Sequence, residues 1–112
     1  MSFVKVANIR ELNDGEKKKV VVNGVEILIS NIDGEYYAIS NKCTHMGGSL
    51  GEGTLVGGII TCPKHGAKFD VRTGKKVGDA KIAFLKIKVK DDGAYAVKIE
   101  GTDLLVNLVE SV

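Results

Sequence analysis

The sequence predicts an all-β fold, an antiparallel sandwich or barrel, and three observations support this. Short β-branched runs recur along the 112-residue chain and are separated by Gly-rich turns. Asn23-Gly24 lies between two such runs, Lys19–Val22 and Val25–Ile29, and this dipeptide accepts the positive φ angles of a hairpin turn. Finally, no stretch of the chain has the long three-to-four-residue apolar period of an amphipathic helix.

Each predicted strand in the first half rests on a β-branched or aromatic run and its flanking turn. Phe3–Val6 predicts a short first strand, and the hairpin around Asn23-Gly24 supplies the next two. Asp33-Gly34 predicts a second tight turn, which leads into a strand at Tyr36–Ile39.

The second half predicts strands by strict alternation. From Leu85 to Lys90, apolar residues alternate with lysines, as expected for a strand with one buried face. The predicted strands are Lys68–Val71, Ala83–Lys90 and Tyr95–Ile99, with turns at 72–75 and 91–93.

Two stretches do not follow this pattern. Gly47–Gly58 contains six glycines in twelve residues and is predicted to be an irregular loop, ordered by something that it binds. The last residues, Asp103–Val112, are compatible with a strand, a helical turn or an association segment.

Composition places the chain among ordinary single-domain globular proteins. Hydrophobic residues make up 44% and charged residues 27%, and the formal net charge is +2. The basic triplet Lys17–Lys19 has no arginine cluster or interleaved aromatics beside it, so no nucleic-acid partner is predicted. Lys5 and Arg10 interrupt the N-terminal segment, which excludes a signal peptide, and no apolar run is long enough to span a membrane. The expected location is the cytoplasm, where a cysteine pair is more often metal-binding or catalytic than a disulfide.

Every cysteine and histidine of the chain lies between residues 43 and 65. Cys43-Thr44-His45 is a C-x-H pair, and Cys62-Pro63-Lys64-His65 is a C-x-x-H pair sixteen residues further on. Two thiolates and two imidazoles at these spacings indicate a metal site, and both zinc and iron–sulfur clusters suit such ligands. Buried core cysteines and structural histidines are the simpler alternative, which the paired arrangement disfavours.

The two boxes, separated by a Gly-rich stretch, resemble the ligand loops of Rieske [2Fe–2S] proteins. The following Phe69–Gly74 is similar to the strand and turn after the second box of soluble Rieske ferredoxins. The resemblance implies an all-β, Rieske-like antiparallel sandwich or barrel with a small cluster-binding subdomain. It implies one domain over residues 1–112, with the cluster-binding subdomain at about 41–72.

By this resemblance, Cys43 and Cys62 bind one iron of a single [2Fe–2S] cluster, and His45 and His65 bind the other. Replacing two thiolates by neutral imidazoles makes the oxidised site neutral, so it accepts an electron at a higher potential than a four-cysteine cluster.

Departures from the family pattern predict a potential at the low end of the Rieske range. High-potential members have an extra cysteine in each box, joined as a disulfide, where this chain has Met46 or its neighbours and Lys64. They also have hydroxyl side chains near the sulfurs, where this chain has Ala67 and Phe69. No proline follows the second box to cover the cluster.

These features predict a one-electron carrier between a reductase and a terminal oxygenase or other acceptor, and not an enzyme. No histidine remains for a second metal centre, which excludes a self-contained oxygenase. Two alternatives stay open, namely a zinc-stabilised binding module without redox function and the small subunit of a nitrite-reductase-like complex. Lys64 and Lys68 flank the boxes and either steer an acidic partner or are ordinary solvated lysines. Five glycines are expected to serve close backbone approach to the cluster, namely Gly47, Gly48, Gly51, Gly53 and Gly66.

Overall fold

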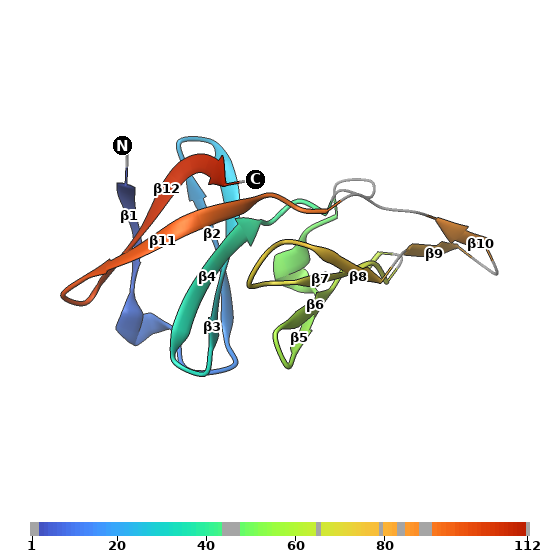
Figure 1. Ribbon diagram of the computed structural model, residues 1–112, viewed down its shortest axis with the longest axis horizontal. Helices are drawn as coiled ribbons and strands as arrows, with labels where there is room; N and C mark the ends of the chain where they lie inside the picture. Colours follow the sequence, from blue (N-terminus) through green and yellow to red (C-terminus); the bar gives the residue numbers. More distant parts are fainter. Residues whose placement is uncertain are drawn as a thin grey trace.

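A computed structural model describes residues 3–43, 48–64, 66–78, 80–82, 85–87 and 91–111. Over these ranges the chain folds into three antiparallel sheets and two short 3₁₀ helices, with no α-helix (Figure 1). The all-β prediction is therefore confirmed.

The large sheet has the strand order β1-β12-β11-β4-β3-β2. Its edge strands β1 and β2 contact each other, so the sheet nearly closes into a barrel. The bounds are β1 Phe3–Asn8, β2 Lys17–Val22, β3 Val25–Ile32, β4 Glu35–Ser40, β11 Ala94–Glu100 and β12 Asp103–Ser111.

The small sheet has the order β5-β6-β7-β8 and lies beside the large sheet (Figure 1). A hairpin of β9 and β10 extends beyond it. The bounds are β5 Thr54–Val56, β6 Ile59–Thr61, β7 Lys68–Asp70, β8 Lys76–Gly78, β9 Ala80–Ile82 and β10 Leu85–Ile87. The 3₁₀ helices are η1 Ile9–Glu11 and η2 Leu50–Glu52.

β3 is buried on both faces and contributes side chains to two separate cores, one of which contains both cysteines. Ile27 and Ile29 belong to the core of the large sheet, while Leu28, on the opposite face, packs in a second core between the two sheets. Its sequence is apolar on consecutive positions because alternate side chains enter different cores. The second core consists of Leu28, Ile32, Ile39, Cys43, Leu50, Ile60, Cys62, Ala67, Phe69 and Val71.

The predicted turns at Asn23-Gly24 and Asp33-Gly34 are confirmed. Asn23 and Gly24 have φ angles of 50° and 79°, and Val22 pairs with Val25 across the hairpin. Asp33 has a φ angle of 55° in the turn between β3 and β4. Both are tight connections in which asparagine, aspartate and glycine tolerate the left-handed conformation.

The prediction of an irregular loop at Gly47–Gly58 is wrong for much of that stretch. The structure has η2 at Leu50–Glu52 and β5 at Thr54–Val56. The many glycines suggested a loop, but Gly53 allows two strands of a regular hairpin to pack closely. A Cβ atom at Gly53 would lie 1.9 Å from the Thr61 carbonyl oxygen.

The structure also gives the outcome of two further predictions. The C-terminal tail forms β12, which pairs with both β1 and β11, so the strand alternative is the right one. Of the predicted strand Ala83–Lys90, the structure has β10 at Leu85–Ile87, and residues 83, 84 and 88–90 lie outside the described residues. Within the described residues, no helix has the length and apolarity to cross a membrane.

Candidate functional site

Each cysteine lies just beyond the end of a strand. Cys43 is the third residue after β4, and Cys62 directly follows β6. Their exposed fractions are 2% and 1%, and both side chains belong to the core between the two sheets. They are not joined by a disulfide. The structure therefore brings into one core two thiols that are separated by eighteen residues in the sequence.

Each cysteine begins a loop that is closed by a backbone hydrogen bond. The Cys43 N–H donates to the Gly48 carbonyl at 2.6 Å, and the Cys62 N–H donates to the Ala67 carbonyl at 2.7 Å. In the second loop the Gly66 N–H also donates to the Cys62 carbonyl at 3.1 Å, and Gly66 has a φ angle of 78°. These short closures hold the cysteines at fixed positions.

His45 and His65 fall within these two loops, and both lie outside the described residues. The described residues accordingly contain no group of three or more potential metal ligands. Cys43 and Cys62 are thus the two predicted ligands whose placement the structure gives.

The loops meet at Gly48. A Cβ atom on Gly48 would lie 2.9 Å from the Cys62 Sγ atom and 3.4 Å from the Lys64 side chain. Gly48 also accepts the hydrogen bond from Cys43, so its backbone lies between both cysteines. Glycine therefore allows a close approach of the first loop to Cys62, while the expected role of Gly48 toward the cluster stays a prediction.

Asn41 joins the first loop to the large sheet. Its side chain is fully buried. Its amide nitrogen donates to the Glu26 carboxylate at 3.1 Å and to Ser49 Oγ at 2.9 Å. Its amide oxygen accepts from the Gly51 N–H at 2.7 Å. The backbone N–H of Leu50 donates to the Asn41 carbonyl at 2.8 Å. One buried side chain therefore anchors both the loop and η2.

The Glu26 carboxylate is held by charge as well. The hydrogen bond from Asn41 and the positive charge of Lys19, 3.6 Å away, lower the pKa of Glu26. The ionised form is therefore favoured at neutral pH, which keeps it an acceptor for Asn41. Sequence reasoning missed Asn41, because nothing in its neighbourhood signals that this polar residue is buried.

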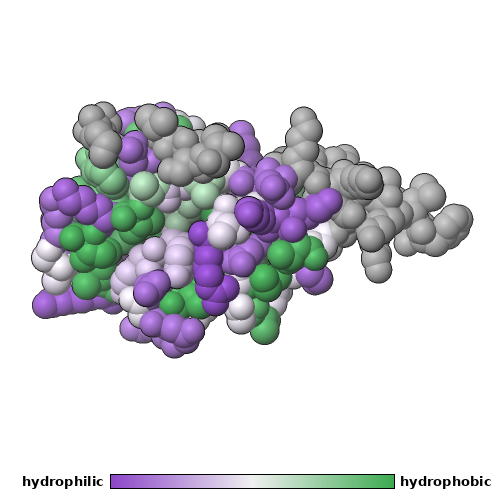
Figure 2. All heavy atoms as spheres, viewed as in Figure 1, coloured by the Kyte–Doolittle hydropathy of each residue, from purple (hydrophilic) through white to green (hydrophobic). Residues whose placement is uncertain are grey.

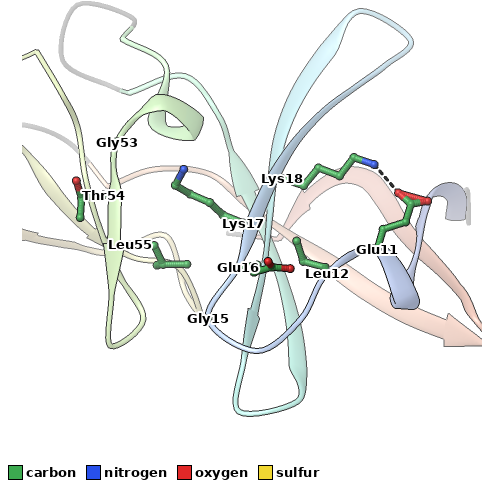
Figure 3. A pocket seen from close by; sticks show the side chains of 9 residues that line it. All are labelled: Glu11, Leu12, Gly15, Glu16, Lys17, Lys18, Gly53, Thr54 and Leu55. Atoms are coloured by element: carbon green, nitrogen blue, oxygen red, sulfur yellow. Dashed lines mark hydrogen bonds and ion pairs between the residues drawn. The ribbon is translucent and has the colours of Figure 1, made fainter.

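Lys17 links the large sheet to η2. Its Nζ atom donates to the Gly51 carbonyl at 2.7 Å. Figure 3 shows Lys17 directed toward the small sheet, at an open cleft of about 560 Å³, while Lys18 points the other way and pairs with Glu11. Both lysines are engaged by protein groups. Its lining residues are Glu11, Leu12, Gly15, Glu16, Lys17, Lys18, Gly53, Thr54 and Leu55.

Comparison with known protein families identifies the chain. The family model described as the Rieske [2Fe–2S] domain matches residues 2–86. The chain belongs to the Rieske family. The similarity to Rieske ferredoxins predicted from the two Cys/His boxes is therefore confirmed.

Curated relatives of this Rieske chain extend over nearly its whole length. It is 37% identical over 108 residues to the biphenyl dioxygenase ferredoxin subunit of Pseudomonas sp. (strain KKS102), covering 96% of this chain and 93% of that one. It is 35% identical over 107 residues to the ferredoxin component of the naphthalene 1,2-dioxygenase/salicylate 5-hydroxylase systems of Ralstonia sp., covering 96% of both chains.

Solved Rieske structures share the fold. The ferredoxin of carbazole 1,9a-dioxygenase from Nocardioides aromaticivorans IC177 is 34% identical, with a TM-score of 0.77 over 95% of this chain and 97% of that one. A ferredoxin from a complex with the reduced oxygenase of carbazole 1,9a-dioxygenase is 26% identical, with a TM-score of 0.81 over 98% of this chain and 96% of that one.

The residues present fit the cofactor of the family. Thiolates suit iron–sulfur clusters, and here two cysteines lie in one buried core, with a glycine at the position where a Cβ atom would lie 2.9 Å from Cys62 Sγ. This Rieske protein binds one [2Fe–2S] cluster. It is an electron-transfer protein of the ferredoxin type and an electron carrier, not an enzyme.

Proposed function

We propose that this protein carries single electrons from a reductase to the terminal oxygenase of a multicomponent aromatic-ring dioxygenase system. The observation that carries the proposal is the near full-length match to ferredoxin components of biphenyl and naphthalene dioxygenase systems. A related ferredoxin with the same fold has been solved in complex with its oxygenase, which supports an oxygenase as the acceptor. The cytoplasm is the proposed location.

Cys43 and Cys62 are the proposed ligands of one iron, and His45 and His65 of the other. The burial of both thiols supports the cysteine half of this assignment. The histidine half rests on the C-x-H and C-x-x-H pattern of the two loops. We further propose that residues 1–112 form one Rieske domain, with the cluster-binding part at about 41–72.

When bound, the cluster supplies a one-electron redox centre, and the protein's own residues determine its setting. Leu50, Ile60 and Phe69 are fully buried and exclude water from the cysteine side. The backbone closures at Gly48 and Ala67 keep both thiolates in place without a disulfide between the loops. A rigid ligand frame keeps reorganisation on electron transfer small.

The reduction potential is proposed to lie at the low end of the Rieske range. Ala67 and Phe69 are buried beside the second loop and have no hydroxyl group to donate to the sulfurs. Without such donors the more negative reduced state is less stabilised, so the potential is lower. A redox titration with a midpoint well above 0 mV would refute this. The potential should also fall as the pH rises above neutral, because an oxidised site that loses an imidazole proton becomes more negative.

The decisive experiment is an EPR spectrum of the dithionite-reduced protein, together with iron and acid-labile sulfide analysis. A Rieske cluster gives a low average g value, which reports nitrogen ligation, whereas a zinc protein is colourless and silent. The His45→Ala variant should lose the Rieske signal, and persistence of the signal would show that His45 is not a ligand.

The oxygenase assignment is tested by reconstitution. The purified protein should be required for electron flow from a reductase to the terminal oxygenase of a reconstituted dioxygenase system. A protein with an intact Rieske signal that does not support oxygenase turnover would point to another acceptor.

A further inference from the structure

The charge of this chain is distributed unevenly between its two parts. From the first residue of β5 to the last of β10, Thr54 to Ile87, the sequence has seven lysine or arginine residues and two aspartates, a formal charge of +5. The rest of the chain has nine basic and twelve acidic residues, a formal charge of −3. The net charge of +2 therefore conceals a positive small-sheet part and a negative large-sheet part.

Two lysines of the positive part lie at the cysteine loops. Lys64 is exposed on the Cys62 loop, and its Cγ and Cδ atoms pack at Gly48, 3.4 Å from the position of a Cβ there. Lys68 begins β7, and its Nζ atom donates at 3.1 Å to Oγ1 of Thr61, the residue before Cys62. The aliphatic stem of Lys68 packs at Gly78. The Lys68 ammonium group is thus held beside the residue before Cys62, and the stem of Lys64 packs against the first cysteine loop.

These two lysines differ from several lysines of the large sheet, whose charges are paired with carboxylates. On the large sheet, lysines pair with carboxylates, as in Lys5–Asp103 at 3.2 Å and Lys98–Glu100 at 3.0 Å. Among the described residues, no carboxylate forms an ion pair with Lys64 or Lys68. Their charges are available to a partner.

The strand next to Lys68 is an edge of the small sheet. Lys68 of β7 pairs with Gly78 of β8, and the adjacent Val77 is 53% exposed. Figure 2 shows hydrophilic residues gathered where the two sheets meet.

We propose that the surface of Lys64 and Lys68 docks on an acidic face of a redox partner protein. The inference rests on the proposed electron-transfer function and adds the sign of the charge that the partner must present. Complementary charge raises the association rate of a transient complex and orients it with the cluster end facing the partner. A nucleic acid is disfavoured as occupant, because Thr54 to Ile87 includes one arginine, Arg72, and the described aromatic residue there, Phe69, is fully buried.

The test compares two variants with the same net charge. The first is Lys64→Gln/Lys68→Gln, in which glutamine keeps the Cβ, Cγ and Cδ atoms that pack at Gly48 and Gly78. The matched control is Lys5→Gln/Lys98→Gln on the large sheet. EPR and absorbance spectra first establish that each variant keeps its cluster.

Oxidation of the reduced proteins is then followed by stopped flow with two small probes, the trianion ferricyanide and the trication tris(phenanthroline)cobalt(III). At about 10 mM ionic strength, the Lys64/Lys68 variant should react several-fold more slowly with ferricyanide and several-fold faster with the cobalt complex than wild type. Both differences should vanish near 0.5 M, where charges are screened beyond about 4 Å. The control should change much less with either probe.

Equal effects of the two variants on proteins with intact Rieske spectra would overturn the docking surface and leave the proposed function standing. A protein without a reducible cluster would overturn both. With the oxygenase as acceptor, the Lys64/Lys68 variant should raise KM for this protein at low salt and leave kcat unchanged. Binding of wild type to duplex DNA or to anionic vesicles at physiological salt, lost in that variant, would overturn the assignment to a protein partner.

Discussion

Asn41 is predicted to be the residue on which the first cysteine loop depends. It is fully buried, and its side chain donates to Glu26 and Ser49 and accepts from the Gly51 N–H. Asn41→Ala removes these three hydrogen bonds, each worth about 1 kcal/mol, and leaves the Gly51 N–H unsatisfied at a further cost of about 1–3 kcal/mol. The expected loss is therefore about 4–6 kcal/mol, a large share of the roughly 5–15 kcal/mol that stabilises a typical domain.

The assay is urea unfolding of the cluster-loaded protein, followed by far-UV circular dichroism and by visible absorbance. The Asn41→Ala variant should unfold at a lower urea concentration and lose its visible absorbance first, because the loop opens before the large sheet. The exposed Asn13 provides the control, since Asn13→Ala should lie within about 0.5 kcal/mol of wild type. Equal stability of the two variants would refute the anchoring role.

A second substitution keeps the shape of the side chain. Asn41→Asp retains an acceptor for the Gly51 N–H and places a second carboxyl beside Glu26. Burial and the neighbouring carboxylate raise the pKa of the introduced aspartate, so its ionisation costs stability. The deficit relative to wild type should be small near pH 5 and grow toward pH 8. A deficit that is independent of pH would contradict this account.

Three further predictions follow from the site. Gly48→Ala places a Cβ 2.9 Å from Cys62 Sγ and should lower the iron and sulfide content well below one cluster per chain, whereas Gly78→Ala, which meets only the flexible stem of Lys68, should retain a full complement. The pKa of Glu26 lies below its ordinary value of 4.5, chiefly because of the hydrogen bond from Asn41, so Glu26 stabilises the fold above pH 4.5 and this contribution is lost as the pH falls through the lowered pKa. Glu26→Gln should therefore flatten the stability profile in acid, and an unchanged acid-unfolding curve would argue against it. Ala67→Ser adds a hydroxyl in the second loop and should raise the midpoint potential by on the order of 50 mV, which for one electron corresponds to about 1 kcal/mol, the net contribution of one hydrogen bond, while an unchanged or lower potential in a redox titration would count against the proposed tuning.

The elements that sequence reasoning placed correctly are those with local signals. The hairpin at Asn23-Gly24 forms because the two residues themselves favour a left-handed turn, whatever lies around them. The alternation from Tyr95 to Ile99 likewise marks β11. The stretch from Gly47 to Gly58 was predicted wrongly, because a glycine that allows tight strand packing has the same local signature as a glycine in a loop.

The candidate site divides in the same way. A metal site could be predicted from the sequence, because two thiols and two imidazoles at short spacings are metal ligands whatever the surrounding fold is, and the resemblance of the two boxes to Rieske proteins indicated the cluster. The contacts that hold the cysteines could not be predicted from the sequence. Gly48 lies against Cys62, and Asn41 reaches Glu26 and Gly51, only after β3, β4 and the small sheet have packed together. Ligand identity is a property of individual side chains, whereas burial and loop anchoring arise from pairings between residues distant in sequence, and no local pattern encodes those.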